Sequence, residues 1–243
     1  FITTKALLKN AEVYHTIKHA DTYGIKVENV SVDFKKNIQR SRDISNRLSK
    51  GIEFLMKKNK ITHITGIGKL TSKTSLEVKN KQKTDSIEAD KIILATGARP
   101  KSFPRMEFDG NRVISFKEAM LLDSPPKKMI IIGSVAIGSE FAYYYNEFGT
   151  EVHMIEMLDR ILPIEDADVS KEVEKSFKKS SIKISTGTKV SKIESLKTKV
   201  KVHTERKGKK EILEGDLALL AVGVTGNIEY LGMEELGLSL IQI

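Results

Sequence analysis

The segment from Met129 to Glu156 limits the possible folds of this 243-residue chain more than any other part of the sequence. Its apolar beginning runs into Gly133, a helical pattern of apolar residues follows over Ala136–Phe148, and a second apolar run covers Glu151–Ile155. A strand, a helix and a second strand within so short a span are typical of a βαβ crossover, in which both strands lie parallel in one sheet. We therefore expect a parallel sheet with its crossover helix at this point of the chain.

The glycines and the final carboxylate of this segment stand where a dinucleotide site needs them. Gly133 permits a tight turn after the first strand, and Gly138 permits the helix to pack closely on the strand. Backbone amides at the helix N-terminus bind pyrophosphate, and a carboxylate such as Glu156 accepts hydrogen bonds from ribose hydroxyls. Because that carboxylate would repel a 2′-phosphate, NAD is favoured, although the nearby Arg160 keeps NADP as an alternative. An ordinary surface carboxylate is the other alternative for Glu156.

One position of the segment departs from the dinucleotide-binding motif. The motif has glycine where Val135 stands, because the backbone there approaches the pyrophosphate closely. Valine adds a branched side chain and stiffens the turn. We expect Val135 to weaken or abolish NAD affinity by steric exclusion without unfolding the strand. The alternatives are a shifted turn that accommodates the side chain, or an error in the sequence.

The rest of the chain is organised as short helices and strands. Apolar residues recur at helical intervals over residues 4–20, 33–59 and 166–179. Strands are expected over residues 61–67, 76–78, 182–185, 189–193, 200–204 and 216–222, and near residue 87. The run KIILATGARP (Lys91–Pro100) predicts a buried strand ending in a tight turn, because apolar residues precede Thr96-Gly97 and Pro100 forbids a helix. Alternating strands and helices followed by a meander indicate the α/β class.

Composition excludes several classes of protein. No run approaches the roughly 18–20 apolar residues that a membrane span needs. The chain has no cysteine, which excludes disulfides, thiolate zinc sites and thiol chemistry for the chain as given and is compatible with a cytoplasmic protein. The net charge is +9, but the lysines are scattered and form no basic stripe with exposed aromatics, so we expect no nucleic-acid partner.

Both ends of the sequence are expected to be cut. The chain starts at Phe1 without a signal pattern and stops inside the apolar run Leu238–Ile243. We interpret it as a piece of a longer protein, with a domain boundary in the Pro- and Gly-containing connector of residues 102–126.

Five stretches of the sequence together resemble the dihydrolipoamide dehydrogenases, which are class I pyridine nucleotide-disulfide oxidoreductases. The stretches are TTKALLKNAEVY (Thr3–Tyr14), ILATGARP (Ile93–Pro100), GSVAIGSEFA (Gly133–Ala142), EVHMIEMLDRILP (Glu151–Pro163) and LLAVGVTGNIEYLGMEELGL (Leu219–Leu238). They follow the order of the family and extend over essentially the whole chain. The acidic Glu156 fits the NAD-using lipoamide branch better than the NADPH-using glutathione branch.

The resemblance implies a fold, an activity and partners. The fold is α/β, with Rossmann-like domains: a partial FAD-binding domain over residues 1–110, an inserted NAD-binding domain over 111–226, and a return segment over 227–243. Members of the family are homodimeric flavoproteins that bind FAD and NAD and oxidise the dihydrolipoyl arm of 2-oxoacid dehydrogenase complexes. The implied partner is therefore the dihydrolipoyl domain of an acyltransferase subunit, in the cytoplasm, with neither nucleic acid nor membrane.

The resemblance also assigns cofactor contacts to positions of this sequence. For FAD these are Lys5, Gly68, Thr96, Gly97 and Ala98. For NAD they are Gly133, Ser134, Val135, Ala136, Ile137, Gly138, Ser139, Glu140, Glu156, Val190 and Gly223. Lys5 would lie beside the flavin and Glu140 near the nicotinamide. Each position has a plain alternative as well: Lys5 as a solvated lysine, Val190 as a core strand residue, and the outlying glycines as simple turns.

The chain also departs from the family pattern at the positions that carry the redox chemistry. The second redox cysteine of the family falls at Phe1, and its catalytic His–Glu pair and first flavin-binding strand have no match in the chain, so no catalytic residue and no metal ligand is assigned. The five histidines are expected to be surface or packing residues. We expect the chain as given not to turn over lipoamide. Two alternatives stay open: a redox-dead paralogue that binds nucleotides, and another flavin disulfide reductase of the glutathione or mercuric type.

Overall fold

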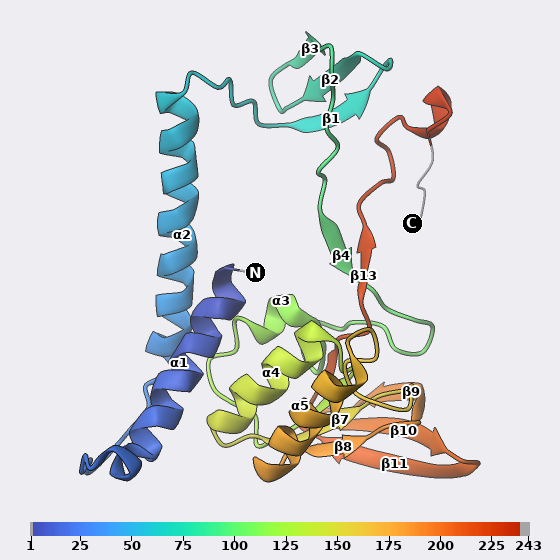
Figure 1. Cartoon of the computed structure of the whole chain (residues 1–243). Coiled ribbons are helices and arrows are strands. Elements are labelled where there is room, and N and C mark those ends of the chain that lie inside the picture. Colours follow the sequence, from blue (N-terminus) through green and yellow to red (C-terminus); the bar gives the residue numbers. More distant parts are fainter. Residues whose placement is uncertain (1, 239–243) are drawn as a thin grey trace. The chain divides into compact units, whose positions relative to one another are not determined.

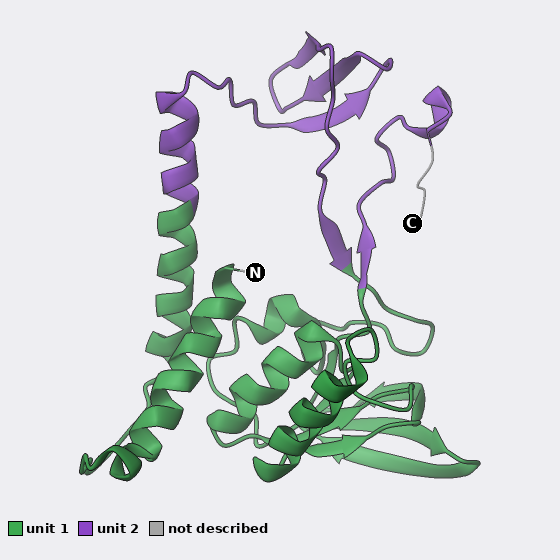
Figure 2. Ribbon diagram, in the orientation of Figure 1, with its two compact units in different colours: residues 1–48, 100–223 green, residues 49–99, 224–243 purple. Residues whose placement is uncertain are grey.

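The computed structural model describes residues 2–238, and the chain divides into two compact units that are described separately (Figure 2). Unit 1 comprises residues 1–48 and 100–223, and unit 2 comprises residues 49–99 and 224–243. These two units are groups of residues that pack together. They do not test the FAD-binding and NAD-binding domain boundaries expected from the resemblance, which stay predictions. Phe1 and residues 239–243, which include most of the final apolar run, lie outside the described residues.

Unit 1 is built on a five-stranded sheet with the order β5-β12-β6-β7-β8, of which β7 and β8 are labelled in Figure 1. Every neighbouring pair in it is parallel. The strands are β5 (Val113–Ile114), β6 (Lys128–Ile132), β7 (Glu151–Ile155), β8 (Lys183–Ser185) and β12 (Leu217–Leu220). Helix α4 (Ala136–Glu147) connects β6 to β7, which confirms the expected crossover between parallel neighbours and the α/β class.

Both faces of the sheet are covered, as a parallel sheet requires. Met129 and Ile131 of β6 belong to a core shared with the helices, whereas Ile130 and Ile132 belong to a core shared with an antiparallel sheet. The helical layer contains α1 (Ile2–Lys18), the first part of α2 (Phe34–Lys58), the short α3 (Phe116–Ala119), α4 and α5 (Ala167–Lys179). The antiparallel sheet consists of β9 (Lys189–Ser195), β10 (Val200–Arg206) and β11 (Lys209–Gly215).

Aromatic side chains of α4 fill the space between the sheet and the other helices. Phe141, Tyr144 and Tyr145 are at most 1% exposed. Burial raises the pKa of Tyr145 well above its ordinary value, and its hydroxyl donates a hydrogen bond to the carbonyl oxygen of Ala119. Tyr14 of α1 stacks on Phe148 with ring centroids 5.3 Å apart. Helix α1 is thereby packed on α4, so both helices belong to one unit.

Unit 2 holds the small hairpin sheet of β1 (Ile67–Leu70), β2 (Ser75–Lys79) and β3 (Thr84–Glu88), all antiparallel. A separate pair joins β4 (Ala98–Pro100) to β13 (Val224–Gly226). The strands expected over residues 76–78 and near residue 87 are confirmed, whereas the strand expected over residues 61–67 is wrong for all but Ile67, where β1 begins.

The buried strand expected over Lys91–Pro100 is wrong for most of its length. Only Ala98–Pro100 is a strand, and the Ile93 side chain is 90% exposed. A run of apolar residues becomes a buried strand only where neighbouring strands and a covering layer exist. No strand pairs with Ile92–Leu94 among the described residues. The strand β11 was not expected either, because its sequence KKEILEG has no run of apolar residues.

None of the helices between residues 2 and 238 is sufficiently long and apolar to cross a membrane.

Deleting the ring of Phe141 tests the helical core of unit 1. We expect Phe141→Ala to lower the free energy of unfolding by about 3–5 kcal/mol, because it removes a buried aromatic side chain and leaves a cavity. The matched control is Leu121→Ala, whose side chain is 52% exposed and whose loss should change stability by about 0.5 kcal/mol or less. Urea unfolding measures both, and equal effects would contradict the assigned core.

The half-buried His153 on β7 should make stability depend on pH. Burial, and then the charges of Lys128 and Lys183, lower its pKa, against the weaker opposite effect of Glu211 and Glu151. The folded protein therefore favours the neutral ring, and the unfolded chain binds the proton more readily. Stability should fall as the pH drops below about 6.5.

The control for this pH dependence is His153→Gln, which keeps a polar group near the Ser185 hydroxyl, 2.8 Å from Nε2 in the wild type. Urea midpoints measured at pH 8 and pH 5.5 should lie closer together in this variant than in the wild type. An unchanged difference would assign the pH dependence to other groups.

Candidate dinucleotide site

The candidate site lies beyond the carboxyl ends of β6, β7 and β12. From β6 the chain crosses to β7 on one side, whereas β12 pairs with β6 on its other side. In open parallel sheets, ligands bind outside the carboxyl ends of the strands where the connections diverge in this way. Gly133 follows β6, Glu156 follows β7 and Ala221 follows β12, so the strand ends bring these three residues to the same edge of the sheet.

Both motif glycines are required by the geometry of the turn. Gly133 has a φ of +97°, and a Cβ atom there would overlap the carbonyl oxygen of Ala221. A Cβ atom at Gly138 would overlap the carbonyl oxygen of Gly133 and lie 3.4 Å from the Cβ of Ala221. The expected roles of a tight turn and of close helix–strand packing are therefore both confirmed.

Val135 is the N-cap of α4 and has an extended backbone, with φ −72° and ψ −175°. Any residue adopts these angles without strain, so valine needs no shift of the turn and costs nothing in the backbone. Its side chain provides no capping hydrogen bond, and the first amides of a helix have no partner inside it. The amides that would face a pyrophosphate are thus free of a side-chain cap from Val135, whose isopropyl group is half-buried.

The Glu156 carboxylate lies against the turn that precedes α4. It is 7% exposed, so it is not an ordinary surface carboxylate. Its Oε2 accepts hydrogen bonds from the Ser134 amide at 3.0 Å and the Ser134 hydroxyl at 2.7 Å, and its Oε1 accepts one from the Leu158 amide at 2.9 Å. A carboxylate offers about four acceptor positions. One position on Oε1 is left for a ligand hydroxyl.

Ser134 connects the turn to its surroundings through its carbonyl group as well. The carbonyl oxygen accepts hydrogen bonds from the Ser139 hydroxyl at 2.9 Å and from the Leu162 amide at 3.3 Å. The loop after β7 therefore holds the turn after β6 from both sides. The amides of Leu158 and Leu162 were not among the expected site residues, because a backbone contribution leaves no mark in the sequence.

Arg160, the residue that kept NADP as an alternative, faces its own loop. One of its terminal nitrogens donates to the carbonyl oxygen of Pro163 at 3.1 Å. Its Nε is buried and has no hydrogen-bond partner among the described residues. The guanidinium is therefore only partly engaged by its own loop, and its buried Nε–H is among the donors that have no partner in the described part of the chain.

The remaining positions expected for NAD differ in their surroundings. Glu140 forms an ion pair with Lys5, which joins α4 to α1 and brings together a residue expected near the nicotinamide and one expected beside the flavin. Gly223 has a φ of +102° and is exposed, as a turn residue would be. Val190 lies in β9 and packs against the core beneath the antiparallel sheet. Ala136 and Ile137 form the first turn of α4.

Of the positions expected for FAD, Lys5 lies in unit 1 and the other four lie in unit 2. Gly68 is in β1, opposite Val78. The Thr96 hydroxyl donates a hydrogen bond to the carbonyl oxygen of Asn227 at 2.6 Å. The backbone amide of Asn227 donates one to the carbonyl oxygen of Gly97 at 3.0 Å. Thr96, Gly97 and Ala98 are exposed, and their flavin contacts stay predictions.

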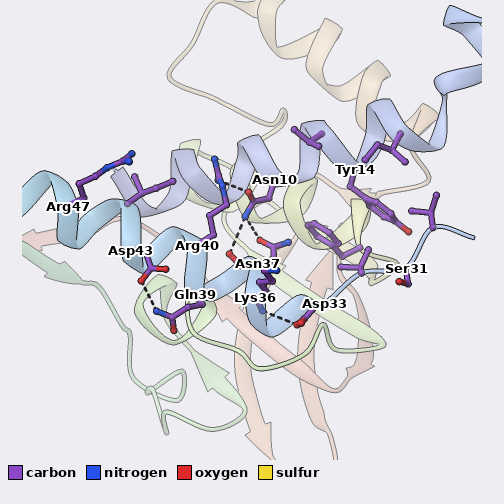
Figure 3. Close-up of a pocket in the computed structure, with 16 residues that line it drawn as sticks. Asn10, Tyr14, Ser31, Asp33, Lys36, Asn37, Gln39, Arg40, Asp43 and Arg47 are labelled. Carbon is purple, nitrogen blue, oxygen red and sulfur yellow. Dashed lines mark hydrogen bonds between the residues drawn. The ribbon is translucent and has the colours of Figure 1, made fainter. Parts of the chain in front are cut away.

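A separate hollow of about 990 Å³ lies between α1 and the first part of α2 (Figure 3). Its polar side chains bind one another: Arg40 donates to Asn10 Oδ1 at 2.6 Å, and Gln39 donates to Asp43 at 2.8 Å. None of the residues expected to contact FAD or NAD lines it. We assign it no role in the dinucleotide site.

Substituting Gly133 tests the turn. We expect Gly133→Ala to lower the free energy of unfolding by roughly 3 kcal/mol or more, because the new Cβ adds an overlap with backbone to the cost of a positive φ. The control is Gly149→Ala, at φ +90° with nothing within 4 Å of the new Cβ, which should cost about 1–2 kcal/mol. Urea denaturation separates the two costs; an equal loss for both variants would rule out the overlap.

Comparisons with known proteins agree with this geometry. The family model described as pyridine nucleotide-disulphide oxidoreductase matches residues 1–242. The chain is 38% identical to the dihydrolipoyl dehydrogenase of Zymomonas mobilis, covering 98% of the chain and 52% of that protein. It is 40% identical to the dihydrolipoyl dehydrogenase of Rhizobium etli, covering 97% of the chain and 53% of that protein.

A solved structure shares the fold. LpdA from Mycobacterium tuberculosis superposes with a TM-score of 0.89 at 24% identity, over 99% of the chain and 52% of LpdA. The chain thus spans about half the length of the relatives that it matches. Enzymes of this kind bind FAD and a nicotinamide dinucleotide. The family model matches nearly the whole chain, and the glycine turn and the carboxylate agree with it. The chain therefore belongs to the pyridine nucleotide-disulphide oxidoreductase family.

Proposed function

We propose that this chain forms the NAD-binding part, with some of the FAD-binding part, of an NAD-dependent dihydrolipoyl dehydrogenase. The observation that supports it most is the position of the Glu156 carboxylate, which is buried against the Ser134 amide at 3.0 Å. A carboxylate held there can accept a hydrogen bond from a ribose hydroxyl and repels a 2′-phosphate. The similarity to dihydrolipoyl dehydrogenases over nearly the whole chain supports the same activity.

The residues present fit a nicotinamide dinucleotide in most respects. Gly133 and Gly138 leave room that a Cβ would fill, and the N-terminus of α4 is without a side-chain cap. The amides of α4 would hold the pyrophosphate, and Glu156 would orient the ribose. NAD, when bound, accepts a hydride, and FAD carries electrons to it from a dithiol. The ion pair between Lys5 and Glu140, both in unit 1, would hold the Glu140 carboxylate in place near the nicotinamide.

The wider role is part of the same proposal. In proteins of the relatives' length we propose a cytoplasmic homodimer that oxidises the dihydrolipoyl domain of an acyltransferase subunit in a 2-oxoacid dehydrogenase complex. The present chain has no cysteine and so supplies no redox dithiol of its own. We therefore propose that the chain alone binds nucleotide without turning over lipoamide.

One observation favours a second candidate. Val135 places an isopropyl group where the motif has glycine, next to the amides that would bind pyrophosphate. A redox-dead paralogue with altered nucleotide binding is consistent with that residue. An NADPH-using reductase of the glutathione type is less consistent, because Glu156 occupies the position that a 2′-phosphate would approach.

Replacing Glu156 tests the role of its charge. We expect Glu156→Gln to weaken NADH binding about tenfold or more, because a hydrogen bond to a charged group contributes about 1.5–3 kcal/mol. NADPH binding should not weaken, so the preference for NADH over NADPH should shrink. Titration followed by NADH fluorescence measures both, with Glu151→Gln as the control, because Glu151 is an exposed carboxylate at the opposite end of β7. An unchanged preference would remove Glu156 from the site.

Replacing Val135 tests the steric exclusion. We expect Val135→Gly to raise the affinities for NADH and NADPH by the same factor, because the pyrophosphate is common to both ligands. The same fluorescence titration measures them. Unchanged affinities would show that the valine side chain does not obstruct the pyrophosphate, and would leave the second candidate without its main support.

A further inference from the structure

We propose that His15, on the last turn of α1, and His19, directly after that helix, form a binding site for a divalent transition-metal ion such as Cu²⁺ or Zn²⁺. The site is separate from the candidate dinucleotide site and does not depend on the proposed function. The two residues are four positions apart, so they lie on the same face of the helix. Their ring centroids are 4.2 Å apart, with the ring planes tilted by 31°.

Each ring has its Nδ1 occupied by a hydrogen-bond acceptor. Nδ1 of His15 lies 3.0 Å from Oε1 of Glu147, and Nδ1 of His19 lies 2.8 Å from the carbonyl oxygen of His15. A proton on Nδ1 satisfies both contacts and leaves the lone pair on Nε2. Among residues 2–238, no hydrogen bond uses either Nε2. Metal-binding histidines are typically held in this way, by a carboxylate or a backbone carbonyl on the opposite nitrogen.

Glu147 anchors the arrangement because it is itself fixed. Its side chain is 6% exposed at the end of α4, and its Oε2 lies 3.0 Å from the Lys18 ammonium. That ammonium also lies over the Tyr14 ring, 4.9 Å from its centroid. The positive charge of Lys18 is thus held by a carboxylate and an aromatic face, which limits its repulsion of a metal ion. The His15 side chain is 49% exposed, so an ion can approach from solvent.

The ligand set determines which ions fit. Zinc–nitrogen distances are about 2.0–2.1 Å, and two exposed imidazoles with adjustable torsion angles can share one ion at that range. No group of three or more potential metal-ligating side chains occurs within the described part of the chain. Water would therefore complete the coordination, and the ion would exchange. For imidazole ligands the affinity should follow the order Co²⁺ < Ni²⁺ < Cu²⁺ > Zn²⁺.

Calorimetric titration of the intact chain with Cu²⁺ tests the site. We expect one ion per chain, and at least a tenfold loss of affinity for both His15→Ala and His19→Ala. The control is His63→Ala, an exposed histidine of unit 2, which should bind as the wild type does. Paramagnetic resonance of the bound Cu²⁺ should show coupling to two imidazole nitrogens, reduced to one in either variant.

A second variant tests whether Glu147 positions the His15 ring for metal binding. Glu147→Gln keeps both ligands but removes the charged acceptor on His15, and we expect it to weaken Cu²⁺ binding about 10- to 100-fold, as loss of such partners typically does. Circular dichroism checks that each variant is folded. Wild-type affinity in both histidine variants, or an equal loss in His63→Ala, would overturn the proposal.

Discussion

The hydrogen bonds between Glu156 and Ser134 are the constraint on which the rest of the candidate site depends. They join the residue after β7 to the turn after β6, and they bury a carboxylate at 7% exposure beside the start of α4. A buried charge is costly unless it is fully hydrogen-bonded, so the turn and the loop after β7 must hold their positions together. The same bonds orient the one acceptor that is left for a ligand. Stability of the turn and the proposed contact with a ribose therefore depend on the same side chain.

Packing behind the sheet keeps this edge rigid. The strand β6 is buried on both faces, with alternate residues in two different cores. Helix α4 cannot move relative to β6 without disturbing Phe141 and Tyr145, which are buried between the sheet and its helices. Close-packed protein interiors deform little. The first turn of α4, which would bind the pyrophosphate, is thus placed by a core that lies away from the ligand.

The sequence allowed most of unit 1 to be predicted, because the periodicity of its apolar residues agrees with their burial. The crossover from β6 through α4 to β7 lies within one residue of its expected bounds. Prediction was wrong where apolar residues have no partner: Lys91–Pro100 has the composition of a buried strand, but Ile93 is 90% exposed. It also missed β11, whose charged residues give no strand pattern. This segment is a strand because its backbone pairs with β10, and that pairing is not visible in the residues of β11 alone.

The sequence by itself determined the glycine turn, the crossover and the carboxylate at the strand end, because each depends on residue type at a short spacing along the chain. Only the tertiary structure decided how that carboxylate is bonded, that the backbone of Val135 is unstrained, and that the amides of Leu158 and Leu162 belong to the site. It also decided that α1 brings Lys5 to Glu140 and His15 to Glu147. These contacts join residues more than 100 positions apart, and their distances follow from packing that no local pattern records.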